Sequence, residues 1–176
     1  MMNRLIGPAA ALLALAHPMA AAAHIVLAEP EARAGSYHAG FFRVSHGCGA
    51  SDTLSIRIEI PKSILIARPQ AKPGWSVSME RAALSEPLPG EGGAITERVS
   101  AITWSGRLPA DQFDTFGVMM KLPEAAGPLH FPTTQSCVEG TRAWVEIPGP
   151  GEAPGARESP APVLILRPAE GHEGHQ

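Results

Sequence analysis

Several features that mark common classes of protein are missing from this sequence of 176 residues. There is no basic run of the kind that neutralises phosphates, and the formal net charge is −3, so nucleic acid is not an expected partner. There is no Gly-x-Ser-x-Gly or His-Glu-x-x-His motif, which argues against the common hydrolase mechanisms. Charged residues make up only 18% against 44% hydrophobic residues, which excludes an intrinsically disordered chain.

Long hydrophobic runs are also missing, except at the amino terminus. A short positive start that includes Arg4 precedes an apolar, Ala/Leu-rich stretch over 5–16, and Ala-Ala-Ala follows at 21–23. This arrangement predicts a signal peptide over 1–23, cleavage before His24, and a soluble mature protein in the periplasm. An uncleaved membrane anchor is the alternative, although the apolar run is short for a bilayer.

No segment after residue 23 has a sustained helical period, whereas the period-two alternation of strands recurs. The stretches 54–60 and 75–80 alternate apolar and polar residues, which places Trp75 on an inward face, as alternation also does for Trp104. Further strands are predicted at 37–44, 95–104, 113–122, 142–147 and 163–166. With 18 Gly and 18 Pro between them, these short strands predict an all-β fold, a compact antiparallel β-sandwich.

This sandwich is expected to form one domain over 24–168. Two stretches within it, 86–93 and 149–162, are rich in Pro and Gly and are predicted to be loops. The polar tail over 169–176 carries His172 and His175 and is expected to be disordered, so any metal capture by these two histidines would be weak.

The sequence has only two cysteines, Cys48 and Cys137. An exported protein meets an oxidising compartment, where an even number of cysteines favours a disulfide. A pair of thiolate ligands for Cu(I) is the alternative, but neither CxxC spacing nor a nearby Met cluster supports it.

The most informative residue is His24. Cleavage before it would leave a histidine with a free α-amino group, and this residue can then chelate a metal through its amine nitrogen and its imidazole Nδ1 together. Nitrogen donors of this kind favour Cu(II) among the first-row divalent metals. The alternative is that an Ala-rich signal peptide simply happens to end before a histidine that the protein does not use.

Such a site needs further ligands, and the residues alone leave their identity open. His38, His46 and His130 lie in predicted strands or turns, where a lone histidine is usually structural. Asp111 and Asp114 lie where a turn enters an apolar strand, and an Asp at such a place is more often a turn former than a ligand.

The mature chain resembles the YcnI-like family of exported bacterial copper-binding proteins. The resemblance rests on the order and spacing of short motifs from about His24 to Leu166. These motifs are Ala23-His24, Gly35-Ser36-Tyr37, Arg43-Val44, Ile60-Pro61, Lys72-Pro73-Gly74-Trp75, Ile102-Thr103-Trp104-Ser105-Gly106, Leu108-Pro109, Phe113-Asp114-Thr115-Phe116 and Trp144-Val145-Glu146-Ile147-Pro148. The Cys48–Cys137 pair is similar to that of the Gram-negative branch of the family.

The resemblance implies an Ig-like or cupredoxin-like β-sandwich with one disulfide, binding one Cu(II) through His24. It also implies an acidic second ligand within 113–116 and a tryptophan, matching Trp144, that shields the metal. Family members usually carry Glu where this chain has Thr115. Asp114 is therefore the expected carboxylate ligand, with Asp111 as the fallback.

The leading functional interpretation is a non-enzymatic copper-binding protein that takes part in copper trafficking or homeostasis. Its expected partners are the copper ion and a membrane copper transporter or another copper chaperone. One alternative is a metal-free interaction or adhesion module of the envelope. A second is a copper-dependent oxidase or monooxygenase, although no second histidine is marked as a ligand and the aromatic content is only 5%.

Overall fold

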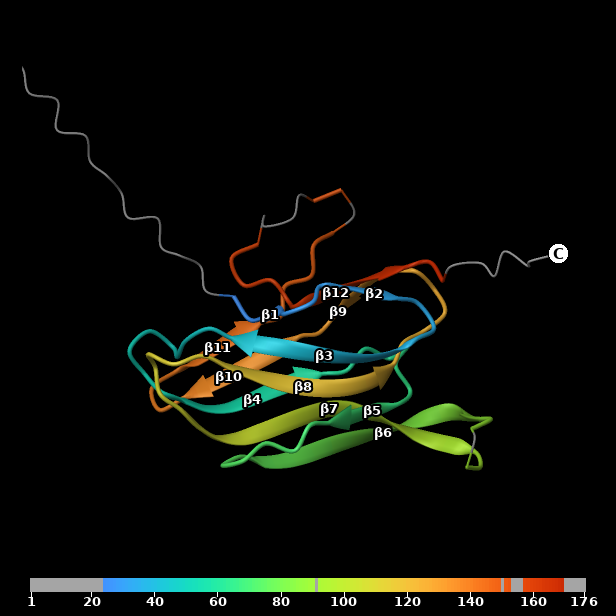
Figure 1. Cartoon of the computed structure of the whole chain (residues 1–176), viewed down its shortest axis with the longest axis horizontal. Helices are drawn as coiled ribbons and strands as arrows, with labels where there is room; N and C mark the ends of the chain where they lie inside the picture. The colour runs from blue at the N-terminus through green and yellow to red at the C-terminus, as the bar shows by residue number, and fades with distance from the viewer. Residues whose placement is uncertain (1–23, 91, 150, 153–156, 170–176) are drawn as a thin grey trace, which may run out of the picture.

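The computed structural model describes residues 24–90, 92–149, 151–152 and 157–169, and in these ranges all regular structure is β-strand (Figure 1). The predicted signal peptide over 1–23 lies outside the described residues, as do His172, His175 and the rest of the tail after residue 169. Within the described ranges, we find no helix with the length and hydropathy that membrane crossing requires.

Twelve strands form three sheets in the described part of the chain. The four-stranded sheet contains, in spatial order, β1 (Val26–Leu27), β3 (Tyr37–Val44), β8 (Asp114–Lys121) and β5 (Ala67–Pro69). The five-stranded sheet contains β11 (Thr141–Trp144), β10 (Thr133–Cys137), β4 (Thr53–Glu59), β7 (Ile95–Leu108) and β6 (Ser76–Leu88). The three-stranded sheet contains β2 (Glu31–Arg33), β12 (Val163–Arg167) and β9 (Gly127–His130).

Aromatic side chains fill the core between the sheets. The Phe42 ring meets the Phe131 ring edge to face at 5.2 Å between centroids, and Phe116 meets Trp104 at 5.6 Å. All four residues have no exposed surface. The sheets that enclose these rings confirm the predicted all-β sandwich, and the full burial of Trp104 confirms its predicted inward position.

Strand β4 confirms the predicted alternation over most of its length, since Ile56 and Ile58 are fully buried. The pattern changes at its start, where Thr53 is buried and Leu54 is 40% exposed. The register between β4 and β7 shifts between Thr53 and Ser55. A bulge of this kind reverses which residues face the core, which explains the exposed leucine.

Strand β6 departs furthest from the prediction. The alternation over 75–80 predicts one buried face, yet Val77 and Met79 are both substantially exposed and Trp75 is only partly buried. The reason is position, because β6 lies at the edge of the five-stranded sheet and pairs only with β7. The strand also continues to Leu88, so the loop predicted over 86–93 starts later, at Pro89.

Two further details differ from the prediction. The strand expected over 142–147 ends at Trp144, and the chain beyond it forms only an isolated bridge between Glu146 and Pro160. One strand pair, β2 with β12, is parallel in an otherwise antiparallel fold. Parallel pairing needs a long connection, and almost the whole domain connects these two strands.

The two cysteines form a disulfide, with 6.1 Å between their Cα atoms. This excludes the alternative in which Cys48 and Cys137 are thiolate ligands for copper. The buried Gln135 side chain fastens the same region, since its Nε2 donates to the His46 carbonyl (2.9 Å) and to Thr53 Oγ1 (2.8 Å). His46 therefore lies in a segment that the disulfide and the Gln135 side chain hold in place.

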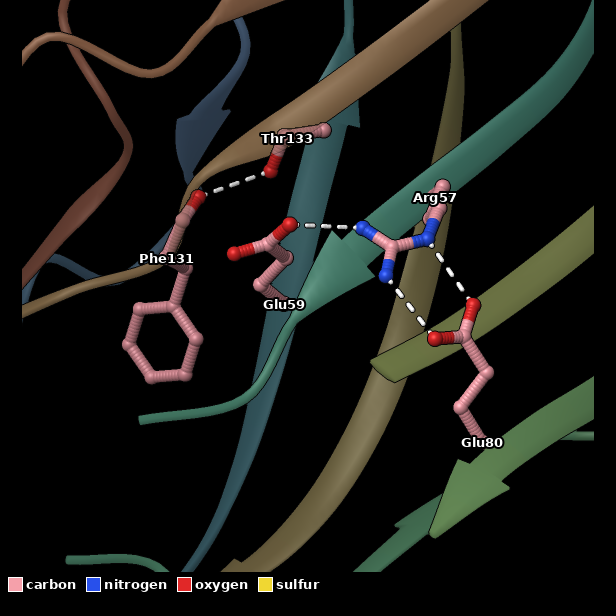
Figure 2. A network of polar contacts seen from close by, with 5 residues as sticks. All are labelled: Arg57, Glu59, Glu80, Phe131 and Thr133. Atoms are coloured by element: carbon pink, nitrogen blue, oxygen red, sulfur yellow. Dashed lines mark hydrogen bonds and ion pairs between the residues drawn. The ribbon is translucent and has the colours of Figure 1, made fainter. Parts of the chain in front are cut away.

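A polar network crosses the outer face of the five-stranded sheet (Figure 2). Arg57 on β4 reaches past β7 to Glu80 on β6, with two hydrogen bonds of 3.0 Å, and it also contacts Glu59 at 2.7 Å. The guanidinium lowers the pKa of Glu80 by hydrogen bonding and charge. This network holds an edge strand that has little core packing of its own.

Candidate metal centre

His24 lies just before β1, at the edge of the four-stranded sheet, and is partly buried. Its Nε2 lies 3.2 Å from the backbone carbonyl oxygen of Glu158. A carbonyl oxygen can only accept a hydrogen bond, so Nε2 must carry the proton in this contact. The other ring nitrogen, Nδ1, makes no hydrogen bond within the described part of the chain and keeps its lone pair available.

Trp144, at the end of β11, packs against the His24 ring. The two rings meet at right angles with 5.4 Å between their centroids. Trp144 is 8% exposed, and its indole Nε1 is buried with no hydrogen-bond partner among the described residues. Buried polar atoms without a partner are few in a core, and His38 and His130 each have one as well. The structure thus brings together His24 and Trp144, two of the residues that the family resemblance implies for the site.

The segment 157–161 contacts His24 through the Glu158 carbonyl. Glu146, in the chain that follows β11, holds this segment in place. Its backbone exchanges hydrogen bonds with Ser159 and Ala161, and its carboxylate accepts a hydrogen bond from the Ser159 N–H. The predicted loop 149–162 therefore includes a section with defined contacts to the candidate centre.

Asp114 begins β8 and has strong partners already. Its Oδ1 accepts hydrogen bonds from Lys72 Nζ at 2.6 Å and from the Thr115 backbone N–H at 2.8 Å. The Asp114 side chain is 30% exposed and that of Lys72 is 18% exposed. Lys72 also lies over the Phe116 ring, at 5.2 Å from its centroid. The carboxylate is thus neutralised by a cation in this state of the protein.

Strand register places His24 and Asp114 at the same end of the four-stranded sheet. Val26 pairs with Arg43, so Ile25 continues this register opposite Val44, and Val44 pairs with Asp114. Two strand spacings separate β1 from β8, which is about 10 Å between backbones. The register thus places Ile25 across from Asp114 and His24 one residue further along, and the described residues show no contact between His24 and Asp114.

The other residues considered as ligands lie elsewhere or in structural roles. Asp111 is exposed in the turn before β8. His38 and His130 each bury one ring nitrogen without a partner, and burial lowers the pKa of both imidazoles. No group of three or more His, Cys, Asp or Glu side chains suited to a metal occurs in the described residues.

The donors around His24 fit one metal class in particular. In the full-length chain the His24 nitrogen is part of a peptide bond, and cleavage after Ala23 would turn it into an amine beside Nδ1. Two nitrogen donors on one residue, with a hydrogen bond already fixing the remote ring nitrogen, suit a divalent ion such as Cu(II). Trp144 would lie beside the ion and shield it from solvent.

Residues 24–166 match a family model described as a domain of unknown function (DUF1775). The chain belongs to this family. YcnI-like proteins typify the DUF1775 family, so the resemblance noted from the short motifs is confirmed. The match starts at His24 itself, the residue predicted to follow the cleavage point.

A solved structure shares the fold of this DUF1775 domain. It is an uncharacterised protein from Nocardia farcinica whose crystal structure reveals an immunoglobulin-like fold. The similarity has a TM-score of 0.59 and 25% sequence identity, and it covers 81% of this chain and 97% of the other. The Ig-like β-sandwich is thereby confirmed. A search of curated proteins finds no match.

Sequence reasoning missed three residues that shape the centre. Lys72 belongs to the motif Lys-Pro-Gly-Trp, which does not indicate that its side chain reaches Asp114, 42 positions away in the chain. Glu146 and the Glu158 carbonyl are likewise distant from His24 in sequence. The only signal for them was the Trp-Val-Glu-Ile-Pro motif, which does not reveal its partners.

Proposed function

We propose that this protein is exported to the cell envelope, loses residues 1–23, and binds one Cu(II) through the amine and Nδ1 of His24. The observation that carries this proposal is the hydrogen bond from His24 Nε2 to the Glu158 carbonyl. It selects the imidazole tautomer in which Nδ1 is free, as a chelating terminal histidine requires.

The membership in the DUF1775 family, the Ig-like sandwich and the disulfide all fit an extracellular domain. A disulfide persists in an oxidising compartment such as the periplasm. In our proposal the protein holds copper for trafficking or homeostasis and is not an enzyme. Its partners are then the copper ion and a membrane copper transporter or another copper chaperone.

Asp114 is the proposed acidic ligand, and Trp144 the proposed shield. Asp114 lies at the same end of the four-stranded sheet as His24. Its carboxylate must give up the hydrogen bond from Lys72, or keep it with one oxygen only, before it can bind a metal. Copper binding would therefore exchange one cationic partner of this carboxylate for another. Asp111 is the remaining carboxylate candidate, and its exposed turn offers less preorganisation.

The decisive experiment compares two proteins that differ by one residue at the terminus. Mature protein beginning at His24 should bind one equivalent of Cu(II), with a nitrogen-rich electron paramagnetic resonance signal. Protein with one alanine left before His24 should bind at least about 100-fold more weakly, since loss of a ligand exceeds the 10–100-fold typical of outer-shell changes. Equal affinity of the two proteins would exclude the terminal-histidine site.

Tryptophan fluorescence locates the ion within the protein. Trp144 touches the His24 ring, whereas Trp75 and Trp104 pack around Phe116. Bound Cu(II) should quench Trp144 most strongly, so most of the quenching should disappear in Trp144→Phe. Quenching that persists in this variant would place the copper elsewhere.

A metal-free interaction module is the second candidate function. The edge strand β6 favours it, because its exposed Val77 and Met79 side chains and unpaired backbone are available to a partner. This candidate predicts that His24→Ala leaves the protein's role in cells intact while a charged residue at Met79 abolishes it.

A further inference from the structure

Glu146 lies two residues beyond Trp144 and makes several contacts with one short segment. Its backbone N–H donates to the Ser159 carbonyl at 3.1 Å, and its own carbonyl accepts from the Ala161 N–H at 2.9 Å. Its carboxylate Oε2 also accepts from the Ser159 N–H at 2.6 Å. The Glu146 side chain therefore adds a third hydrogen bond between two segments that the backbone of Glu146 already joins.

The peptide unit between Glu158 and Ser159 explains why this matters. Its N–H is the group bound by the Glu146 carboxylate, and its carbonyl is the group that accepts from His24 Nε2. A trans peptide is planar and directs its C=O and N–H to opposite sides. One carboxylate and one imidazole thus bind the two ends of a single peptide dipole.

We infer that Glu146 is a positioning residue for His24 and acts through this shared peptide unit; the inference rests on the proposed copper function. The chain of contacts runs from the Glu146 carboxylate, through the peptide, to the Nε2–H of His24. An ionised acceptor strengthens the hydrogen bond that the Ser159 N–H donates and polarises the peptide carbonyl, and a polarised carbonyl accepts more strongly from Nε2. The result is a fixed tautomer and a more electron-rich Nδ1.

This arrangement has the chemical logic of the carboxylate–histidine–metal triad, in which an outer carboxylate orients a ligating imidazole. Here a peptide unit stands between the carboxylate and the ring. Trp144 fixes the ring from one side and the Glu158 carbonyl fixes it from another. The first contact comes from β11, two residues before Glu146, and the second comes from the segment that Glu146 binds.

The test uses mature protein beginning at His24 and two substitutions of Glu146. Glu146→Gln keeps an oxygen acceptor but removes the charge, and Glu146→Ala removes both. Cu(II) affinity should fall in the order wild type, Glu146→Gln, Glu146→Ala, with a total loss of about 10–100-fold. Thermal unfolding of each variant checks that the fold survives.

Glu152→Gln is the matched control. Glu152 also binds this part of the chain, through the Gly149 N–H at 2.6 Å and Arg157 at 2.8 Å, but it does not touch the peptide between Glu158 and Ser159. Its loss should leave copper affinity within about twofold of wild type, well inside the outer-shell range. An equal loss in Glu152→Gln and Glu146→Gln would show that loop integrity, not the shared peptide, sets the affinity.

A second readout needs no copper and separates the two proposals. In metal-free mature protein, nitrogen-15 NMR of the His24 ring should show a proton held on Nε2 and protected from solvent exchange. Glu146→Ala should accelerate this exchange and mix the tautomers, and unchanged ring signals would overturn the inference. Failure of wild-type copper binding at His24 would defeat the proposed function alone, since the ring signals still report the action of Glu146.

Discussion

Two candidate ligands lie at one end of the same sheet but in opposite states. His24 is oriented by the Trp144 ring and by the Glu158 carbonyl, and both contacts leave Nδ1 free. Asp114 has its Oδ1 occupied by the Lys72 ammonium and the Thr115 N–H. Packing orients the first residue and leaves one of its donor atoms free, whereas an ion pair occupies the donor atom of the second. The comparison shows that proximity alone does not make a ligand.

The largest expected effect is a loss of stability when the Trp144 side chain, which packs against His24, is removed. Trp144→Ala should lower the free energy of unfolding by about 3–5 kcal/mol, because a large buried side chain leaves a cavity. Trp144→Phe keeps an aromatic edge against His24 and removes the unpaired Nε1, so it should cost much less. Chemical denaturation measures both changes. Equal losses in the two variants would mean that the indole Nε1 matters more than the packing.

The next effect tests whether Lys72 keeps Asp114 from the metal. Lys72→Met should tighten Cu(II) binding by about tenfold, because it frees the Asp114 carboxylate from a charge-assisted hydrogen bond worth roughly 1.5–3 kcal/mol. If the gain comes from release of Asp114, it should be absent when Lys72→Met is made in the Asp114→Asn background. Competition titration with a chelator measures the four proteins.

The same set of variants can contradict the role of Asp114. An equal gain in both backgrounds would show that only the charge of Lys72 matters. The role of Asp114 would then be structural, as the ion-pair partner of Lys72 at the first position of β8. Asp111 would become the next carboxylate to test as a ligand.

The smallest effect concerns the histidines away from this sheet end. Burial lowers the pKa of His38 and His130, so protonation favours the unfolded chain. Their contribution to stability is therefore present above their ordinary pKa of about 6.5 and is lost as the pH falls below it. The double variant His38→Gln, His130→Gln should unfold at a temperature that varies less between pH 7 and pH 5. Its copper affinity should equal that of wild type, in contrast to His24→Ala.

Local pattern predicted much of the sandwich. The strand expected over 37–44 matches β3 residue for residue, and those at 54–60 and 95–104 lie on β4 and β7. These strands carry strong alternation because one face of each is buried. Strands β1, β2, β5, β9 and β10 were missed. The first three have only two or three residues and so contain no period to detect, and the buried positions of β10 are Thr133, Gln135 and Cys137, which give no hydrophobic alternation.

Position within the sheet explains the errors. Met79 follows the same alternation as Ile58, yet it is 45% exposed because β6 is an edge strand. Leu54 is exposed because a bulge moves Thr53 into the core. Neither strand order nor bulges leave a clear mark in a single sequence.

The sequence by itself determined the all-β class, the cysteine pair and the presence of a histidine at the expected cleavage point. These follow from residue type, spacing and periodicity, which are local properties. Only the tertiary structure decided that the His24 ring meets Trp144, that its Nε2 faces the Glu158 carbonyl, and that Lys72 holds Asp114. These contacts join positions from 42 to 134 residues apart, and the pairing of strands across the sandwich brings them together.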